Sequence, residues 1–223
     1  MSDFLQIWAD SFPSLALATI GVTIPLSLIA FAIALVLAVI TARARVSRFR
    51  LARAVAWFYV WVFRGTPLLV QLFIVFFGLP RVGITFNAWT AGIITLALNT
   101  GAYASEGIRA AESSIPAGQW EAARVLHLTR WETLRYVIAP QMWRIALPPL
   151  SNEFINIFKS TSLVSTITLA DVFQVGQQIT ARIYEPLAVY TEVALIYLLI
   201  STLLTWIQGR LEHRLSRYVA VAK

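Results

Sequence analysis

Four polar side chains stand within one apolar stretch of this sequence, and their types and spacing could do chemistry. Asn152, Asn156 and Lys159 are about one helical turn apart, so a helix would place them on one face. Glu153 would lie about 100° further round, next to that face. Charged groups inside membrane-spanning stretches are expensive and mark functional sites by default. The segment predicts either a face that binds or gates a solute, or a structural pair of Lys159 with Glu153, within the chain or across a dimer seam.

Motifs for covalent or metal-assisted catalysis are absent from the sequence. Cysteine does not occur, which excludes a disulfide scaffold, a thiolate metal site and a cysteine nucleophile. There is no G-x-x-x-x-G-K-[ST] phosphate loop, no H-E-x-x-H and no G-x-S-x-G, and His127 and His213 are far apart in sequence. We therefore expect no catalytic residue, no metal site and no bound cofactor, and a protein that moves or holds something.

The composition indicates the elements that must position these residues. Hydrophobic residues make up 58% of the 223 and charged residues 13%, whereas soluble domains carry about 25% charged residues. Residues 11–42 contain no charge, and about 20 apolar residues are enough to span a bilayer. We predict an all-α integral membrane protein with a single domain over residues 1–223. Its five spans are expected at about residues 15–41, 55–79, 84–104, 145–169 and 186–207.

Lys and Arg are distributed unequally over the loops that this five-span reading defines. Fourteen of the 18 fall on one side, in residues 43–53, in residues 106–144 and in the C-terminal tail, which includes Arg217 and Lys223. Arg81 and Arg182 fall on the other side, and Arg64 and Lys159 fall within spans. Because cytoplasmic loops are enriched in basic residues, we predict an outside N-terminus and a cytoplasmic C-terminus. The +7 net charge then orients the chain and does not indicate a nucleic-acid partner.

Further polar residues and helix breakers lie in the other spans. Asn99 either lines a path or bonds a neighbouring helix, and Glu192 is expected to be solvated near the outer interface. Arg64 is read as structural, snorkelling to the interface or bonding backbone at a dimer or gate contact. Gly65 and Pro67 are expected to break the helix beside it.

Three local signals predict short helices and bends outside the main spans. In the polar loop of residues 106–144, Ser114 and Pro116 suggest one helix start, and Thr129 with Glu132 forms a capping box that opens a second helix. This second helix is expected to reach about residue 138, with Pro140 ending it. Residues 168–171 resemble a further helix start, followed by an amphipathic helix on the membrane surface. Pro25 is expected to kink the first span.

Four ordered sequence blocks resemble one protein family. The polar loop contains Glu121-Ala122-Ala123 and continues to Ile145-Ala146-Leu147-Pro148, like the EAA loop of ATP-binding-cassette importer permeases. The other blocks are Phe63 to Phe73 (FRGTPLLVQLF), Leu98 to Tyr103 (LNTGAY) and Lys159 to Leu163 (KSTSL). The best match is to permeases of the polar amino-acid group, which includes those for histidine, glutamine, arginine and cystine. The resemblance covers nearly the whole chain.

This resemblance implies a type I importer permease of the bacterial inner membrane, with partners on both sides of the bilayer. They are a cytoplasmic ATP-binding subunit that carries the ATP and Mg²⁺, a second permease copy or paralogue, and an extracytoplasmic amino-acid-binding protein. The EAA loop would dock in a groove of the ATPase, and its small residues would allow close approach. The implied coupling residues are Gln119, Trp120, Glu121, Ala122, Ala123, Arg124 and His127. His127 departs from the family, which usually has glycine there.

The resemblance also gives the polar face of residues 152–159 a ligand. An amino-acid zwitterion needs a cation for its carboxylate and acceptors for its ammonium group. Lys159 would serve the carboxylate, while Glu153 and the two asparagines would serve the ammonium group or a polar side chain. The run Ser160-Thr161-Ser162 adds hydroxyls and would loosen the helix. Because the family often has an acid at Ser160, we expect a less cationic substrate than arginine, with cystine or glutamine-like solutes favoured.

Two other classes of protein fit the same spans. The first is an ATP-independent channel or facilitator for small polar solutes, and the second is a membrane anchor or scaffold without transport. Only the importer reading requires an ATP-binding subunit that binds tightly to the EAA loop, so co-purification of such a subunit separates the three.

Overall fold

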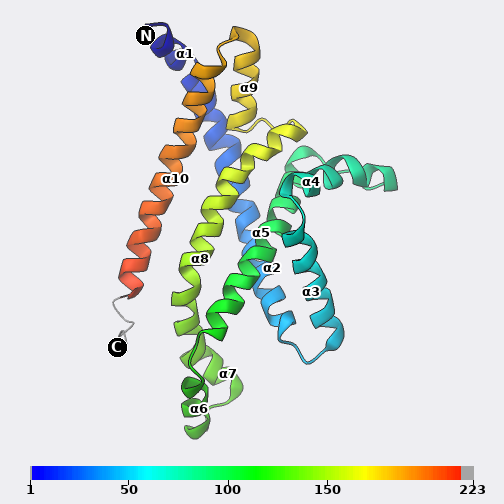
Figure 1. The fold of residues 1–223 in the computed structure, drawn as a ribbon, viewed down its shortest axis with the longest axis vertical. Helices are drawn as coiled ribbons and strands as arrows, with labels where there is room; N and C mark the ends of the chain where they lie inside the picture. Colours follow the sequence, from blue (N-terminus) through cyan, green and yellow to red (C-terminus); the bar gives the residue numbers. More distant parts are fainter. Residues whose placement is uncertain (1, 217–223) are drawn as a thin grey trace.

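The computed structural model describes residues 2–216, and all of its regular elements there are helical (Figure 1). Arg217 and Lys223, counted above with the basic tail, lie outside the described residues. The α-helices are α1 Ser2–Ala18, α2 Ile24–Arg45, α3 Arg50–Gly65, α4 Leu68–Phe73, α5 Ala88–Ser113, α6 Ala117–Val125, α7 Arg130–Glu132, α8 Ala139–Ser160, α9 Val172–Ile183 and α10 Pro186–Ser216. The π-helical and 3₁₀ segments are η1 Thr19–Thr23, η2 Ile74–Gly78, η3 Leu79–Val82, η4 Thr133–Ile138 and η5 Thr161–Ile167.

The first predicted span lies within one long helical unit. α1, η1 and α2 form a continuous run of 42 residues, Phe4–Arg45. Pro25 does not interrupt it, because the π-helical turn Thr19–Thr23 directly before the proline absorbs the irregularity of the ladder. The Thr23 hydroxyl in this turn accepts a hydrogen bond from the backbone N–H of Val172 (3.1 Å) and so ties the long helix to the start of α9.

Small residues let α2 and α5 pack closely at the centre of the bundle. Ala30, Ala34, Ala38 and Ala42 recur every fourth residue on α2, and none is more than 2% exposed. Gly101 of α5 faces this row: a Cβ there would lie 2.9 Å from the Tyr59 hydroxyl oxygen and 3.3 Å from the Ala34 carbonyl oxygen. Close backbone approach through small residues is a common way for membrane helices to associate. The α2–α5 pair therefore provides the rigid frame for the other helices.

The second predicted span is not one straight helix. α3 ends at Gly65, and the helical run Leu68–Val82 leaves it at an angle of 108°. Thr66 and Pro67 are extended between the two helices, because proline has no N–H to continue the ladder and disfavours helical geometry in the residue before it. The break expected at Gly65 and Pro67 is therefore present, and α3 and α4 form a broken pair.

Length and hydropathy alone identify fewer spans than predicted. Phe4–Arg45 and Pro186–Arg214 are long and apolar enough, and the bent α3–α4 pair adds a third. The other two long helices, α5 and α8, do not pass this test. Both carry charged residues, and α5 also buries small and hydroxyl residues such as Thr95, Gly101 and Ser105. The count of five spans stays a prediction.

α8 differs from its predicted boundaries at both ends. It begins at Ala139 and follows η4 without interruption, so Pro140 does not end a helix. Proline is tolerated there because the π-helical segment Thr133–Ile138 directly before it already departs from the regular i→i−4 ladder, as η1 does before Pro25. At the other end the helix stops at Ser160, and the chain tightens into the 3₁₀ segment η5.

The connections gather at the two ends of the bundle (Figure 1). At one end, α6, α7 and η4 form a projecting knob beside the α2–α3 turn; at the other end lie the N-terminus, α4 and α9.

Two predicted helix starts are corrected by the structure. Ser114 terminates α5 and does not cap α6, and Asp171, not Thr168, caps α9 by accepting from the Gln174 N–H (2.9 Å). Thr168 instead adopts a left-handed conformation with φ 63°.

Candidate functional site

The knob is held in shape by a well-defined turn after α6. His127 has φ 54°, the left-handed conformation that ends many helices. Its N–H donates to the Arg124 carbonyl (3.0 Å), and the Leu128 N–H donates to the Ala123 carbonyl (3.0 Å). These two bonds make a Schellman motif with His127 at the position where glycine is preferred. The turn therefore keeps its helix-ending geometry although histidine reaches this conformation at some cost.

A second device fixes the knob after this turn. The Thr129 hydroxyl accepts from the Glu132 N–H (3.2 Å), and the Glu132 carboxylate accepts from the Thr129 N–H (2.8 Å), which is a complete capping box. The hydrogen bonds from Thr129 hold the pKa of Glu132 below its usual range. Gln141 of α8 donates to the Gln119 side chain on α6 (3.1 Å) and links the knob to the long helix. The knob is thus a folded unit, not a loose loop.

The predicted coupling residues do not all face the same way. Glu121 and Ala122 are exposed, as are Gln119, Arg124 and His127, and Trp120 is half-buried. Ala123 is 1% exposed and packs inside the knob, so it is unavailable for close approach by a partner. Val125 and Leu126 are 77% and 71% exposed and continue the face of Glu121 and Ala122. Sequence reasoning missed these two residues, although their helical spacing from Glu121 and Ala122 would have placed them on that face.

Asn99 takes part in a hydrogen-bonded latch at the break between α3 and α4. Its amide donates to the Phe63 carbonyl (3.1 Å) and to the Gln71 side-chain oxygen (3.0 Å). Gln71 in turn donates to the Phe63 carbonyl (3.0 Å) and to the Thr66 hydroxyl (2.8 Å). Backbone carbonyls freed by the break thereby find donors from α4 and α5. Of the two roles open for Asn99, these contacts favour bonding of a neighbouring helix.

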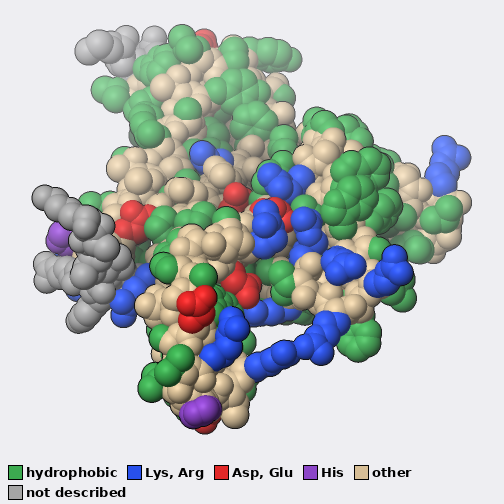
Figure 2. Space-filling view, turned by 60° about the horizontal axis from the view of Figure 1, so that its bottom comes forward, with side chains coloured by type: hydrophobic (Ala, Val, Ile, Leu, Met, Phe, Trp, Pro, Cys, Tyr) green, Lys and Arg blue, Asp and Glu red, His purple; other side chains and the backbone are tan. Residues whose placement is uncertain are grey.

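Arg64, just before this break, contributes to a charged cluster against α5. Its guanidinium lies 5.2 Å from the centre of the Tyr103 ring and 3.9 Å from Glu106. Glu106 also pairs with Arg109 (2.9 Å) and Arg45 (3.3 Å). Burial alone would raise the pKa of Glu106, but the bond and charge of Arg109, with the charges of Arg45 and Arg64, hold that pKa below its usual range. Figure 2, in which the end of the molecule with the knob is turned forward, shows basic side chains gathered on this face.

The polar face of α8 contrasts with these satisfied groups. Asn152, Asn156 and Lys159 are exposed on it, and Glu153 is half-buried beside them. Among the described residues no ion pair joins Lys159 to Glu153, so pairing within the chain is not what holds them. The Gln208 side chain of α10 donates to the side-chain oxygen of Asn152 (3.2 Å). Lys159 and Asn156 are therefore left to bind water, a solute or another subunit.

The hydroxyl run after Lys159 is mostly committed to its own backbone. Thr161 is fully buried and donates to the Phe158 carbonyl (2.8 Å), and Ser162 donates to the Lys159 carbonyl (2.9 Å). Such back-bonding competes with helix ladders, and η5 begins at Thr161. Ser160 ends α8 and is half-buried. Thr161 therefore belongs to the packing behind the polar face, not to the face itself.

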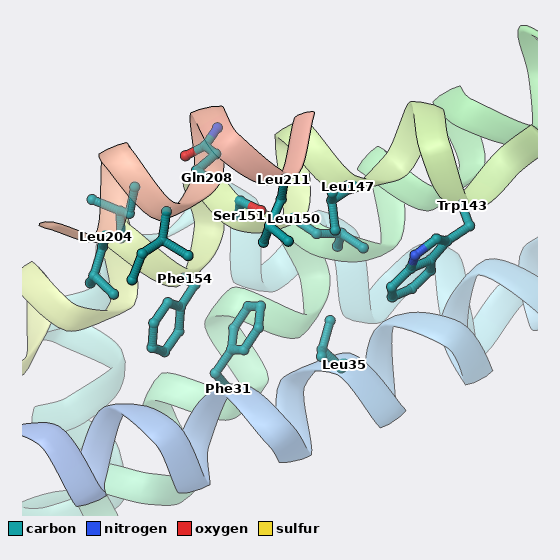
Figure 3. Close-up of a pocket in the computed structure, with 12 residues that line it drawn as sticks. Phe31, Leu35, Trp143, Leu147, Leu150, Ser151, Phe154, Leu204, Gln208 and Leu211 are labelled. Carbon is teal, nitrogen blue, oxygen red and sulfur yellow. The ribbon is translucent and has the colours of Figure 1, made fainter. Parts of the chain in front are cut away.

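One pocket lies away from these polar residues, between α2, α8 and α10 (Figure 3). It encloses about 200 Å³, and its walls are mainly the apolar side chains of Phe31, Leu35, Trp143 and Phe154 and of leucines on α8 and α10. Such walls offer no partners for a charged solute. A polar solute would fit the face of Asn156 and Lys159 better than this pocket.

Glu192 and its neighbours correct a further expectation. Glu192 was predicted to be solvated, yet it is 4% exposed, and one of its oxygens accepts from the Ser11 hydroxyl between α10 and α1. At the same end the Tyr197 hydroxyl donates a hydrogen bond to the Asp171 carboxylate (3.1 Å). Asp171 is fully buried. These contacts fasten α1, α9 and α10 together. No local pattern predicts these contacts, because the two residues of each pair are far apart in the chain.

Comparison with known proteins defines the class of the chain. Residues 34–217 match the family described as the binding-protein-dependent transport system inner membrane component. The L-cystine transport system permease protein TcyB of Bacillus subtilis is 48% identical over 199 residues, which cover 89% of this chain and 85% of that protein. The glutamine transport system permease protein GlnP of Escherichia coli is 37% identical over 212 residues, covering 93% and 97%.

Solved structures agree with this relationship. The crystal structure of an amino acid ABC transporter with histidines has a chain that superposes with a TM-score of 0.89 at 35% identity, covering 95% of this chain and 98% of its own. The MetNI methionine ABC transporter superposes with a TM-score of 0.70 at 19% identity, covering 89% and 93%, and supports the fold alone.

The chain belongs to the family of binding-protein-dependent transport system inner membrane components. It has the all-helical fold of type I ABC importer permeases. Membership of this family implies an ATP-binding subunit and a substrate-binding protein as partners. ATP hydrolysis belongs to the partner subunit, so this chain is a permease and not itself an enzyme.

Proposed function

We propose that this chain is the permease subunit of an ATP-driven importer of polar amino acids. The observation that carries the proposal is one continuous helical path. η4 of the knob leads directly into α8, whose 22 residues end beside Lys159. At 1.5 Å per residue this helix is about 33 Å long. A displacement of the knob by an ATPase would therefore reach the polar face without passing through a flexible loop.

The polar face of α8 supplies the proposed contacts with substrate. Lys159 would hold the carboxylate of the amino acid, while Glu153, Asn152 and Asn156 would accept from its ammonium group or side chain. A lysine exposed on a membrane helix cannot face lipid at low cost. It therefore faces an aqueous path or a second permease copy, and we infer that two permease subunits form the path between them.

The identity of the substrate is narrowed by the neighbouring residues and by the relatives. Ser160 stands where an acid would favour a strongly cationic substrate, so Glu153 alone supplies negative charge on this face. TcyB and GlnP are permeases for cystine and glutamine. We infer a zwitterionic substrate with a polar side chain, of the cystine or glutamine type.

The orientation and partners follow the distribution of charge. The α2–α3 turn and the knob, which together carry eight of the 18 Lys and Arg residues, lie at the same end of the bundle (Figure 1). We infer that this end is cytoplasmic and the N-terminus outside, with five spans crossing the inner membrane. The ATP-binding subunit would then meet Glu121, Ala122, Val125 and Leu126 of the knob, and the amino-acid-binding protein would meet the opposite end.

Reversal of one charge on the knob tests the proposal. Glu121→Lys should abolish co-purification of the ATP-binding subunit and uncouple ATP hydrolysis from uptake, because a lysine would replace the one acid on the proposed docking face. Glu185→Lys, at another exposed acid at the opposite end, is the control for retention of that subunit. Wild-type transport by Glu121→Lys would overturn the proposal, and transport without any ATP-binding subunit would favour the facilitator.

A further inference from the structure

The turn between α2 and α3 carries positive charge that the described part of the chain does not neutralise. Five arginines lie within residues 43–53, and no acidic residue occurs between Asp10 and Glu106. Arg43 pairs with Glu112 and Arg45 with Glu106, both at 3.3 Å. Arg48, Arg50 and Arg53 are exposed and have no acidic partner among the described residues. The turn therefore favours an anion from outside the chain.

The start of α3 adds backbone donors at the same place. Its first residue is Arg50, and Phe49 before it provides no side-chain cap. The first N–H groups of a helix have no intrahelical partner, and the helix dipole favours negative charge there. Arg45, Arg50, Arg53 and Trp57 line a hollow of about 620 Å³ on one side of this turn. The hollow has room and donors for a phosphate group.

An apolar groove opens on the other side of the same first turn. It has a volume of about 760 Å³ and runs between α2 and α3 from Phe49 and Leu51 to Tyr59 and Leu98. Phe49 and Leu51 at its mouth are 78% and 77% exposed. At its far end the Tyr59 hydroxyl is already committed to the Leu98 carbonyl (2.6 Å). The groove thus offers apolar contact to a long chain and few free polar partners.

We propose that this region binds an anionic glycerophospholipid. The phosphate lies in the hollow at the start of α3 beside Arg50 and Arg53, and an acyl chain passes over Phe49 and Leu51 into the α2–α3 groove. Charge complementarity selects the headgroup, since each basic residue near a membrane surface strengthens binding of anionic lipid about fivefold. A free phosphate would use the arginines and leave the groove empty. The inference does not rest on transport or on an ATP-binding subunit.

Native mass spectrometry of the full chain in detergent measures the proposed binding directly. Phosphatidylglycerol should bind more tightly than phosphatidylethanolamine with the same acyl chains. The double variant Arg50→Gln/Arg53→Gln should weaken phosphatidylglycerol binding roughly 25-fold, at about fivefold for each arginine. Arg130→Gln/Arg135→Gln removes the same charge from the knob and should leave binding unchanged.

A second pair of variants tests the acyl groove. Val55 lines it and Val36 does not, and both are 59% exposed. Val55→Trp should weaken phosphatidylglycerol binding at least tenfold, whereas Val36→Trp should leave it unchanged. Equal affinity for the two lipids, equal losses in both arginine pairs, or full competition by inorganic phosphate would overturn the proposal. So would a chain dimer that Val55→Trp dissociates, since a second copy would then cover the groove.

Discussion

The latch at the α3–α4 break and the polar face of α8 both place amide side chains among apolar helices, yet they end in opposite states. In the latch, Asn99 and Gln71 direct their amide groups at each other and at the carbonyls of the break. On α8, Asn156 and Lys159 are exposed and no contact within the described residues satisfies them. Polar groups with internal partners stabilise a fold, whereas polar groups kept without them are available to a ligand.

The α3–α4 break and the end of α8 also differ in how their irregular backbone is held. The break at Gly65 and Pro67 is locked by side chains from α4 and α5, so the bend is a fixed part of the frame. The end of α8 at Ser160, next to the exposed Lys159, is formed mainly by local hydroxyl bonds, with one contact of Thr161 to the Tyr197 hydroxyl of α10 (3.5 Å). We infer that the latch is static during transport and that the end of α8 meets the substrate.

Loss of the lysine on α8 should have the largest effect on transport. Lys159→Met removes the proposed cation for the substrate carboxylate, and loss of one member of a charge pair costs about 2–5 kcal/mol, so substrate affinity should fall roughly 30-fold or more. Because Lys159 is exposed, the melting temperature should stay near that of the wild type. Uptake into proteoliposomes and thermal unfolding together measure this. A variant with unchanged uptake would place the lysine outside the path.

Loss of the latch should lower the stability of the fold, which loss of Lys159 leaves unchanged. Gln71→Leu removes the donors for the Phe63 and Thr66 oxygens and leaves the Asn99 amide short of an acceptor, so unfolding should become easier by about 2–3 kcal/mol. Gln177→Leu, at an exposed glutamine of α9, is the matched control and should change stability little. Thermal unfolding in detergent measures both. Equal melting temperatures for the two variants would refute the structural role of the latch.

Acidification should have the smallest effect, through Glu106. Its pKa is held below its usual range by Arg109, Arg45 and Arg64. The carboxylate therefore contributes stability above its unfolded pKa, near 4.5, and this contribution is lost as the pH falls through the lower pKa of the folded state. Glu106→Gln should be less stable than the wild type at pH 7 and should lose less stability on acidification. Parallel melting curves for both proteins across this range would contradict the assignment.

The sequence was most informative where local rules dominate. The capping box at Thr129 and Glu132 and the loosening of the helix by the hydroxyl run 160–162 both follow from short-range bonding. The structure has the box, and its α-helix gives way to a 3₁₀ segment at Thr161. The family resemblance was also sound, because its motifs extend over most of the chain. The prediction for Pro140 was wrong. Proline ends many helices, but here the π-helical segment directly before it lets the helical run continue.

Local sequence patterns could not predict contacts between residues that are far apart in the chain. Glu192 meets Ser11, and Asn99 meets Phe63 and Gln71, only because the tertiary fold brings distant helices together. Burial of Ala123 is of the same kind, since its sequence neighbours Glu121 and Ala122 are exposed. The roles proposed for the α8 face and the knob stay predictions until they are measured in the assembled transporter.

The natural absence of cysteine permits one direct test of the central claim, that the exposed face of α8 lines an aqueous path for the substrate. In the assembled transporter in membranes, a membrane-impermeant thiol reagent should modify Asn156→Cys. The substrate amino acid should slow this reaction, whereas Leu198→Cys, on an apolar and 59% exposed position of α10, should stay unmodified. Failure of the reagent to reach Asn156→Cys, or labelling equal to that of Leu198→Cys, would contradict the account.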